Sequence, residues 1–374
     1  MSACPVGGAS VTSVSSTLLG AVDQVCRDRI EPAALAVDGD VVPRSHLDAL
    51  APTGLLAGVT ARTGAGQVRA AHERLAGACL STWFVVAQHQ MPVQFVRAAP
   101  EPLRSAVTPL LESGTTISGI AFSHLRRWPH RPVEVERLPG GWRFSGSAPW
   151  YTGWGINDVM VLAGASPDGR VVFALVPAEA SERVRPGAPL DTLAMTAART
   201  VPLVLDGLVV PDDGILAVTS MDDWAATDGR KTANVSPAVF GVADAAVQRL
   251  LGGQEGAGQA AGTALRAAVD EVRREAYDLL DNAEPHQQLD RRVALRAHAL
   301  RLCVEATTAL VVSRGGRALV RSDDAQLLAR WALFLTVQAQ TPALRAELLA
   351  TLAAPRPGPT RPAVSPKAGR PTRP

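Results

Sequence analysis

The stretch that decides the fold prediction is GWRFSGSAPWYT, at residues 141–152. Its first residues, from Trp142 to Ser145, alternate between apolar and polar types, as expected for a half-buried β-strand. Side chains two positions apart share a face of a strand, so we expect Trp150 and Thr152 to point the same way. One interpretation makes Trp150 a core aromatic and Thr152 a surface β-former. The other makes the end of this strand a ligand-binding surface.

Further strand signals surround this stretch and outline a β-domain over residues 116–215. Residues 159–163 and 171–176 are apolar runs, and the turn sequence SPDG at 166–169 predicts that they form a hairpin. Another strand, or a strand pair, runs from Val201 to the proline at 211. Strands and helices do not alternate in this region, so we expect an antiparallel sheet rather than a parallel one.

Apolar residues on both sides of the β-domain recur at spacings of three and four, which is typical of amphipathic helices. We expect an N-terminal helical domain over residues 13–115 and a C-terminal helical bundle over residues 216–354. Gly315-Gly316 should end one long helix as a left-handed C-cap. The expected helices are one capped by Ser15 or Ser16 that runs to about Ile30, followed by 46–56, 68–89, 102–111, 237–251, 265–280, 289–311, 324–337 and 342–353.

The predicted fold class is therefore α+β, with an N-terminal helical domain, a central antiparallel β-domain and a C-terminal helical bundle. Residues 1–12 are small and polar, and residues 355–374 are rich in proline without any periodicity, so we expect both tails to be disordered. The C-terminal tail carries five basic residues and no acidic one.

Composition excludes several classes of function. The net charge of the chain is +2, and it becomes −3 without the five charges of the C-terminal tail, so charge gives no support for nucleic-acid binding. No apolar run reaches the length of a membrane span, and no signal-peptide pattern is present. Cys4, Cys26, Cys79 and Cys303 are isolated, which is typical of reduced thiols and predicts a cytoplasmic protein.

The order of the three regions, together with three short motifs, resembles the acyl-CoA dehydrogenase family over nearly the whole chain. The strand, glycine and Trp150-x-Thr152 pattern is similar to the flavin-binding segment of that family. The resemblance implies that FAD lies on the β-domain, with the indole against its ring and the Thr152 hydroxyl near its N5 edge. The segment 198–211, which ends in Val-Pro, resembles the exit from the family's β-domain.

The third motif lies in the C-terminal bundle. Gly315-Gly316, Arg330, Ala332 and Thr341 fall without a gap on the family's Gly-Gly turn, Arg-Asp-Ala helix and Glu-Gly-Thr segment. The resemblance implies that Thr341 approaches the flavin nucleotide. It also implies that Gly315 and Gly316 let the backbone approach the dinucleotide of a neighbouring subunit.

Several positions depart from the family pattern. The family's catalytic Glu aligns with Ala339, and the earlier position used by some members aligns with Lys231, so neither supplies a carboxylate base. The family's Thr-Glu-Pro-x-x-Gly-Ser loop is replaced by residues 123–127, where Ser123 still offers a hydroxyl. Arg126 and Arg127 are either phosphate ligands or solvated surface residues. The family's pyrophosphate-binding Arg-x-x-Phe-Gly motif is absent.

Three functions fit this pattern. The first is an FAD-dependent oxidoreductase that performs α,β-dehydrogenation of an acyl thioester, with an unidentified base drawn from Asp222, Asp223, Asp228 or Asp324. The second is a flavin-dependent monooxygenase on the same fold, which needs no such base. The third is a degenerate, non-catalytic subunit. His89 and His124 are either active-site residues or hydrogen-bonded structural ones. The resemblance also implies a homodimer or homotetramer and an electron-transfer partner.

Overall fold

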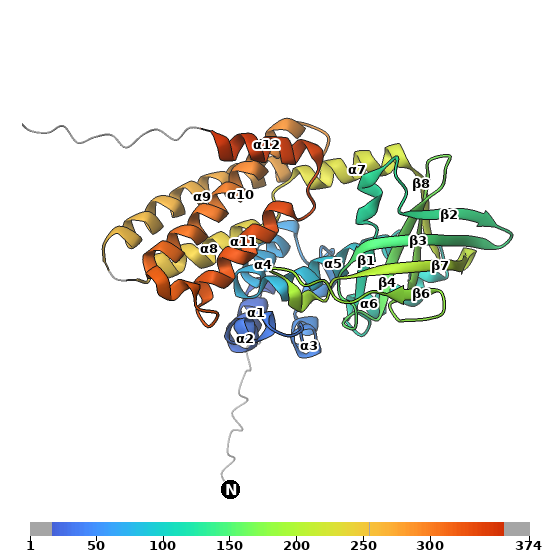
Figure 1. The fold of residues 1–374 in the computed structure, drawn as a ribbon, viewed down its shortest axis with the longest axis horizontal. Helices are drawn as coiled ribbons and strands as arrows, with labels where there is room; N and C mark the ends of the chain where they lie inside the picture. The colour runs from blue at the N-terminus through green and yellow to red at the C-terminus, as the bar shows by residue number, and fades with distance from the viewer. Residues whose placement is uncertain (1–16, 254, 355–374) are drawn as a thin grey trace, which may run out of the picture.

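The computed structural model describes residues 17–253 and 255–354. The predictions for residues 1–12, for a cap at Ser15 or Ser16 and for the tail 355–374 lie outside these residues. Figure 1 shows the β-domain at one end of an elongated molecule and the C-terminal bundle at the other, with the N-terminal helices between and below them. The predicted fold class and the order of its three regions are confirmed.

The N-terminal region is helical, as predicted, but several boundaries differ. The first helix continues past Ile30 to Asp38, and the helix expected over 46–56 ends at Leu50 and is followed by two 3₁₀ turns. The helix predicted for 68–89 is two helices, α4 and α5, because Cys79 adopts an extended backbone with φ −157° and ψ 105°. The first seven residues of α5 are all buried, which identifies it as a central helix of the core. The helices here are α1 Leu18–Val25, α2 Glu31–Asp38, α3 Arg44–Leu50, α4 Ala65–Ala78, α5 Leu80–Arg97 and α6 Leu103–Glu112, with short helical turns η1 Cys26–Ile30, η2 Ala51–Thr53 and η3 Leu55–Ala57.

The β-domain contains one twisted sheet with the strand order β6-β7-β3-β2-β4-β5-β8, and β1 pairs with β4 outside this path. The predicted hairpin is confirmed, since β4 and β5 pair antiparallel from Val159↔Pro177 to Ala165↔Val171. The strands are β1 Ser118–Ala121, β2 Val133–Leu138, β3 Gly141–Tyr151, β4 Val159–Ala165, β5 Arg170–Pro177, β6 Val184–Pro186, β7 Val201–Pro211 and β8 Ile215–Ser220.

The sheet differs from the prediction in two respects. It is mixed rather than purely antiparallel, because β1 and β2 both pair parallel with β4. The long excursion through β2 and β3 gives the chain enough length for a crossover back to β1. The β-domain also extends beyond residue 215, because the apolar run of β8 pairs with β5 as far as Ser220. The next helix starts only at Met221, where the Ser220 hydroxyl accepts a hydrogen bond from the Asp223 N–H.

The C-terminal bundle contains all the predicted helices, but α9 begins at Ala257, before the expected start at 265, and α7 is an additional helix. Helices α4 and α8 approach each other so tightly that a Cβ atom on Gly241 would lie 2.1 Å from the Glu73 carbonyl oxygen. Helix α10 ends at Arg314, and Gly315 follows as its C-cap, so the predicted glycine stop is confirmed. The cap is not the left-handed one expected, because Gly315 combines a φ of +63° with a ψ of −151°. The elements are α7 Met221–Ala233, α8 Pro237–Leu251, α9 Ala257–Asn282, α10 Leu289–Arg314, η7 Gly315–Leu319, α11 Asp324–Val337 and α12 Pro342–Ala353.

In the part of the chain that the structure describes, no helix is both long enough and apolar enough to cross a membrane. The same residues contain no group of three or more His, Cys, Asp or Glu side chains that could hold a metal ion.

Candidate functional site

The end of strand β3 presents a large aromatic side chain to solvent. Trp150 is 51% exposed, whereas Tyr151, the next residue, is completely buried. Thr152 follows the strand and is buried, with its Oγ1 atom 3.1 Å from Oγ1 of Thr200 at the start of β7. The interpretation of Trp150 as a core aromatic is therefore wrong. The alternation that predicted a common face for Trp150 and Thr152 does not reach Thr152, because β3 ends at Tyr151 and its register shifts after Ala148. The exposed indole, two residues from the hydroxyl pair in sequence, offers a flat apolar face to a ligand.

The backbone around this hydroxyl pair is unusually constrained. Met195 and Arg199, on either side of the short helix η5 Thr196–Ala198, have φ values of 68° and 52° in the left-handed region. The N–H groups of Gly153 and Trp154 donate to the carbonyls of Ala198 and Arg199 and join the end of β3 to this segment. Left-handed non-glycine residues persist only where the surrounding structure holds them, and they concentrate at functional sites.

Asn157 provides a second set of hydrogen bonds to the end of β3. Its Nδ2 atom donates to Tyr151 Oη and to the Thr152 carbonyl, both at 3.0 Å. Cβ atoms added to Gly119 or Gly153 would lie 2.2 and 2.1 Å from this nitrogen, so both positions need glycine. The Asn157 Oδ1 atom is buried and has no hydrogen-bond partner. The sequence gives no signal for Asn157, because its partners become apparent only in the folded chain.

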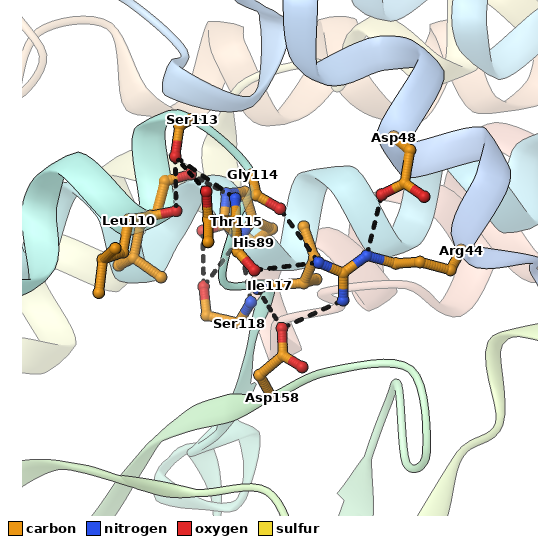
Figure 2. A network of polar contacts seen from close by, with 11 residues as sticks. Arg44, Asp48, His89, Leu110, Ser113, Gly114, Thr115, Ile117, Ser118 and Asp158 are labelled. Carbon is orange, nitrogen blue, oxygen red and sulfur yellow. Dashed lines mark hydrogen bonds and ion pairs between the residues drawn. The ribbon is translucent and has the colours of Figure 1, made fainter.

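A polar network supports the same corner of the β-domain (Figure 2). Arg44 of α3 reaches Oδ2 of Asp158 at 3.2 Å and donates to the carbonyls of Gly114 and Thr115 at 3.1 Å. The same carboxylate oxygen accepts from the Ile117 N–H at 2.7 Å. Asp158 follows Asn157 directly, so this network fixes the entrance to β4 relative to the loop before β1.

His89 belongs to this network as a structural residue. Its Nδ1 accepts from the Ser118 N–H at 3.0 Å, which leaves Nε2 to donate to the Leu111 carbonyl at 3.0 Å. Burial lowers its pKa to about 4, so it is neutral at physiological pH. His124 is equally buried, bonds to the Ala163 carbonyl and has a pKa lowered by burial to about 4. For both histidines the geometry supports the structural interpretation.

The altered loop is the 3₁₀ helix η4, Ser123–Arg127, which packs against β3 and β4. Ser123 is half-buried at its start. Arg126 donates through Nε and Nη2 to the two carboxylate oxygens of Asp228 on α7, each at 2.7 Å. Arg126 is therefore occupied by a protein carboxylate and is not a free phosphate ligand, whereas Arg127 is exposed.

The two positions at which the resemblance expects a catalytic Glu lie at one junction, which contains a cation. Arg296 of α10 is 3% exposed and donates to the carbonyls of Thr232 and Gln338, the latter at 2.8 Å. Thr232 directly follows Lys231, and Gln338 directly precedes Ala339. Ala339 has a left-handed backbone with φ +49°, and Thr341 caps α12 by accepting from the Leu344 N–H.

The four aspartates considered as substitute bases lie in different places. Asp228 is beside the junction through Arg126 and α7. Asp222 and Asp223 are in the first turn of α7, where Asp223 takes part in the helix cap. Asp324 pairs with Arg249 and Arg314. Only Asp228 is near the carbonyls that Arg296 binds.

Gly315 and Gly316 lie in η7, between α10 and α11, at the end of the bundle remote from the β-domain (Figure 1). Within one chain they are therefore not brought together with Trp150 and Thr152, and their role toward a neighbouring subunit stays a prediction. A cavity of about 210 Å³ lies beside this end of α10, lined by Arg249, Arg314, Arg317 and Trp331 among others.

Comparisons with known proteins bear on the fold. No family model matches the chain, and no curated protein matches it in sequence. The structure is similar to butyryl-CoA dehydrogenase from Megasphaera elsdenii, with a TM-score of 0.74 and 14% identity over 92% of this chain and 98% of that one. It is similar to a glutaryl-CoA dehydrogenase from Mycobacterium smegmatis in complex with FADH2, with a TM-score of 0.73 and 15% identity over 90% and 93%.

A dibenzothiophene monooxygenase from Paenibacillus sp. A11-2 has the same architecture, with a TM-score of 0.71 and 18% identity over 90% of this chain and 96% of that one. The matched proteins thus catalyse different reactions on one scaffold. The resemblance predicted from the sequence is confirmed at the level of structure: this chain has the acyl-CoA dehydrogenase fold.

Proposed function

We propose that the protein is a flavin-dependent oxidoreductase that binds FAD against Trp150 and Thr152 and performs α,β-dehydrogenation of an acyl thioester. The observation that carries the proposal is the half-exposed indole of Trp150, two residues before the Thr152 hydroxyl that pairs with Thr200. The similar structures include acyl-CoA dehydrogenases, one of them in complex with FADH2.

The residues at this surface fit an isoalloxazine ring. Trp150 offers a flat apolar face that a ring system can cover. In a pair of hydroxyl groups, one hydrogen makes the shared bond and the other remains free to donate. The Thr152–Thr200 pair therefore supplies one hydroxyl donor for a ligand, on a backbone that Asn157 and η5 hold in place. When bound, the flavin would supply the hydride acceptor for an oxidation.

Proton removal is the step that needs a group other than the usual Glu. We propose Asp228 as the general base, because it is the one of the four candidate aspartates that lies beside the Thr232–Gln338 junction. Each of its oxygens accepts one hydrogen bond from Arg126 and keeps a second lone pair that can take a proton, although protonation would weaken the ion pair. Asp228→Asn should then abolish substrate-dependent flavin reduction and leave FAD binding unchanged.

A second reaction, oxygenation with reduced flavin, is favoured by one observation. The junction at which a base is expected holds the cation of Arg296, and neither Ala339 nor Lys231 supplies a carboxylate. Such a reaction does not require a base there, and the dibenzothiophene monooxygenase has the same fold.

The experiment that separates these reactions starts from the purified protein loaded with FAD. Anaerobic mixing with acyl-CoAs of graded chain length should bleach the flavin for at least one substrate. If none bleaches it, dehydrogenation is wrong, and a preference for reduced over oxidised flavin would favour oxygenation. A chain that binds neither form would be a non-catalytic subunit.

We also propose that the chain forms a homodimer or homotetramer. Four leucine and valine side chains on α11 and α12 are at least half exposed: Leu333, Val337, Leu349 and Leu352. Contiguous exposed apolar surface on a bundle usually marks an interface. Light scattering behind a sizing column should give a mass that is two or four times that of the chain, and a monomer would contradict this part of the proposal.

A further inference from the structure

The junction between α7, α10 and the α11–α12 turn contains a cation that packing alone does not explain. Arg296 is 3% exposed, and its Nε atom has no hydrogen-bond partner. Among residues 17–253 and 255–354, no carboxylate oxygen lies within 4.0 Å of its guanidinium nitrogens. Burial without a direct counter-ion is unfavourable for a charged group, so a methionine or leucine would fill the same space at lower cost.

The contacts of Arg296 indicate what the charge does. One nitrogen, Nη1, donates to the carbonyl of Thr232 in the last turn of α7, and the other, Nη2, donates to the carbonyl of Gln338 at the end of α11. A planar guanidinium has donors in fixed directions, so it can join two carbonyls on different elements in one geometry. Arg296 remains charged at neutral pH, since burial lowers its pKa only to about 10.

The turn that Arg296 holds needs such support. Ala339, directly after Gln338, has φ +49°, a conformation that L-residues other than glycine rarely adopt. Two residues later, Thr341 caps α12. Between the Gln338 carbonyl and this cap, the chain passes through the left-handed Ala339. The Arg126–Asp228 pair lies next to this tie, because Asp228 is one turn before Thr232 on α7 and its carbonyl accepts from Thr232 Oγ1 at 2.6 Å.

We propose that Arg296 is a positioning residue of the flavin-dependent site: it ties the end of α7 to the 338–341 turn and so fixes the backbone of Ala339 and Thr341 relative to Asp228. The inference rests on the proposed function and adds to it a residue that acts through others rather than by touching the ligand.

The test uses Arg296→Met, Arg296→Lys and a matched control, Arg292→Met, in the full-length chain. Arg292 lies one turn earlier on α10, is 2% exposed and donates to the carbonyls of Leu279 at the end of α9 and of Ala283, and to Oδ1 of Asn234 directly after α7. Removing it should destabilise the fold to a similar degree without touching the Gln338 carbonyl. If Arg296→Met does not fold, Arg296→Lys carries the test.

Hydrogen exchange measured without flavin reports the tie itself. We expect Arg296→Met to speed exchange at residues 338–344 by about tenfold, the effect of losing a charge-assisted hydrogen bond. Arg292→Met should speed exchange at the α9–α10 connection and near Asn234, and leave residues 338–344 unchanged. Unchanged exchange at 338–344 in Arg296→Met would overturn the proposal, whatever the fate of the flavin.

FAD titration reports the link to the site. Arg296→Met should bind FAD about tenfold more weakly and change the visible circular dichroism of the bound flavin. Arg296→Lys should recover part of the affinity for FAD. Arg292→Met should match the wild type in both measurements. Equal binding and an equal spectrum in all variants would overturn the positioning role. If the wild type itself binds no flavin, the proposed function fails, and hydrogen exchange then decides alone whether the tie exists.

Discussion

The end of β3 and the junction around Arg296 are built in opposite ways. At the end of β3, neutral hydroxyl and amide groups surround an exposed indole, with hydrogen bonds between Thr152 and Thr200 and from Asn157. At the junction, a buried guanidinium binds two carbonyls and lies beside an Arg–Asp pair. The first region exposes the apolar face of Trp150 above buried polar groups, while the second uses its donors to hold protein backbone.

Because of this difference, substitutions in the two regions should affect ligand affinity and folding stability to different degrees. Removing an exposed side chain such as Trp150 removes few contacts within the protein. The affinity for FAD should therefore fall while the protein stays folded. Removing a buried hydrogen-bonding group leaves its partner atoms buried without a hydrogen bond from protein or water, so the free energy of unfolding should fall as well. The predictions below use this contrast, beginning with the largest effect.

Acid should destabilise the protein through its buried histidines. Burial lowers the pKa values of His72, His89 and His124 from 6.5 to about 4. The unfolded chain takes up these protons near pH 6.5, whereas the folded chain takes them up only near pH 4. Stability present above pH 6.5 is therefore lost as the pH falls toward 4, by roughly 2 kcal/mol per histidine between pH 7 and pH 5.

Urea unfolding at pH 7 and pH 5 checks this expectation, and His89→Gln should reduce the pH dependence. An unfolding free energy that is the same at both pH values would show that these histidines can take up protons without disrupting the β-domain corner.

Trp150→Ala should weaken FAD binding by about 2 kcal/mol, close to thirtyfold, because the ring loses its apolar cover. The unfolding temperature should stay within a few degrees of the wild type, since the indole is already half exposed. Trp150→Phe should keep much of the affinity. A large drop in stability with unchanged affinity would reverse the contrast between the two regions.

Asn157→Ala should lower the free energy of unfolding by about 1–3 kcal/mol, because the buried Tyr151 hydroxyl and Thr152 carbonyl lose their donor. FAD affinity should fall too, through the position of Thr152. Chemical denaturation and flavin titration of the same preparation measure both quantities. Loss of stability with full affinity would mean that Thr152 is held adequately by Thr200 alone.

Thr200→Val should have the smallest effect, a loss of about 1 kcal/mol in FAD affinity. The substitution keeps the shape and removes the hydroxyl that pairs with Thr152. Thr196→Val, in the neighbouring η5 turn, serves as the control with no bond to Thr152. Indistinguishable affinities for the two variants would exclude a role for the hydroxyl pair.

The parts of the structure that the sequence allowed us to predict are those with local signals. Helix periodicity and the SPDG turn each occupy a short stretch, so their structure follows from neighbouring residues. Parallel pairing of β1 with β4 could not be predicted, because it depends on where a long excursion returns. Asn157, Thr200 and Arg296 were missed because the groups they bind lie on other elements, and Arg296 looks like one more polar residue of a helix.

FAD titration of the purified wild-type chain beside Trp150→Ala tests the central claim most directly. We expect saturable binding of one FAD per chain to the wild type and an affinity about thirtyfold lower for Trp150→Ala. Circular dichroism should show that both proteins are equally folded. No binding to the wild type, or equal affinity of the two proteins, would contradict a flavin site at the end of β3.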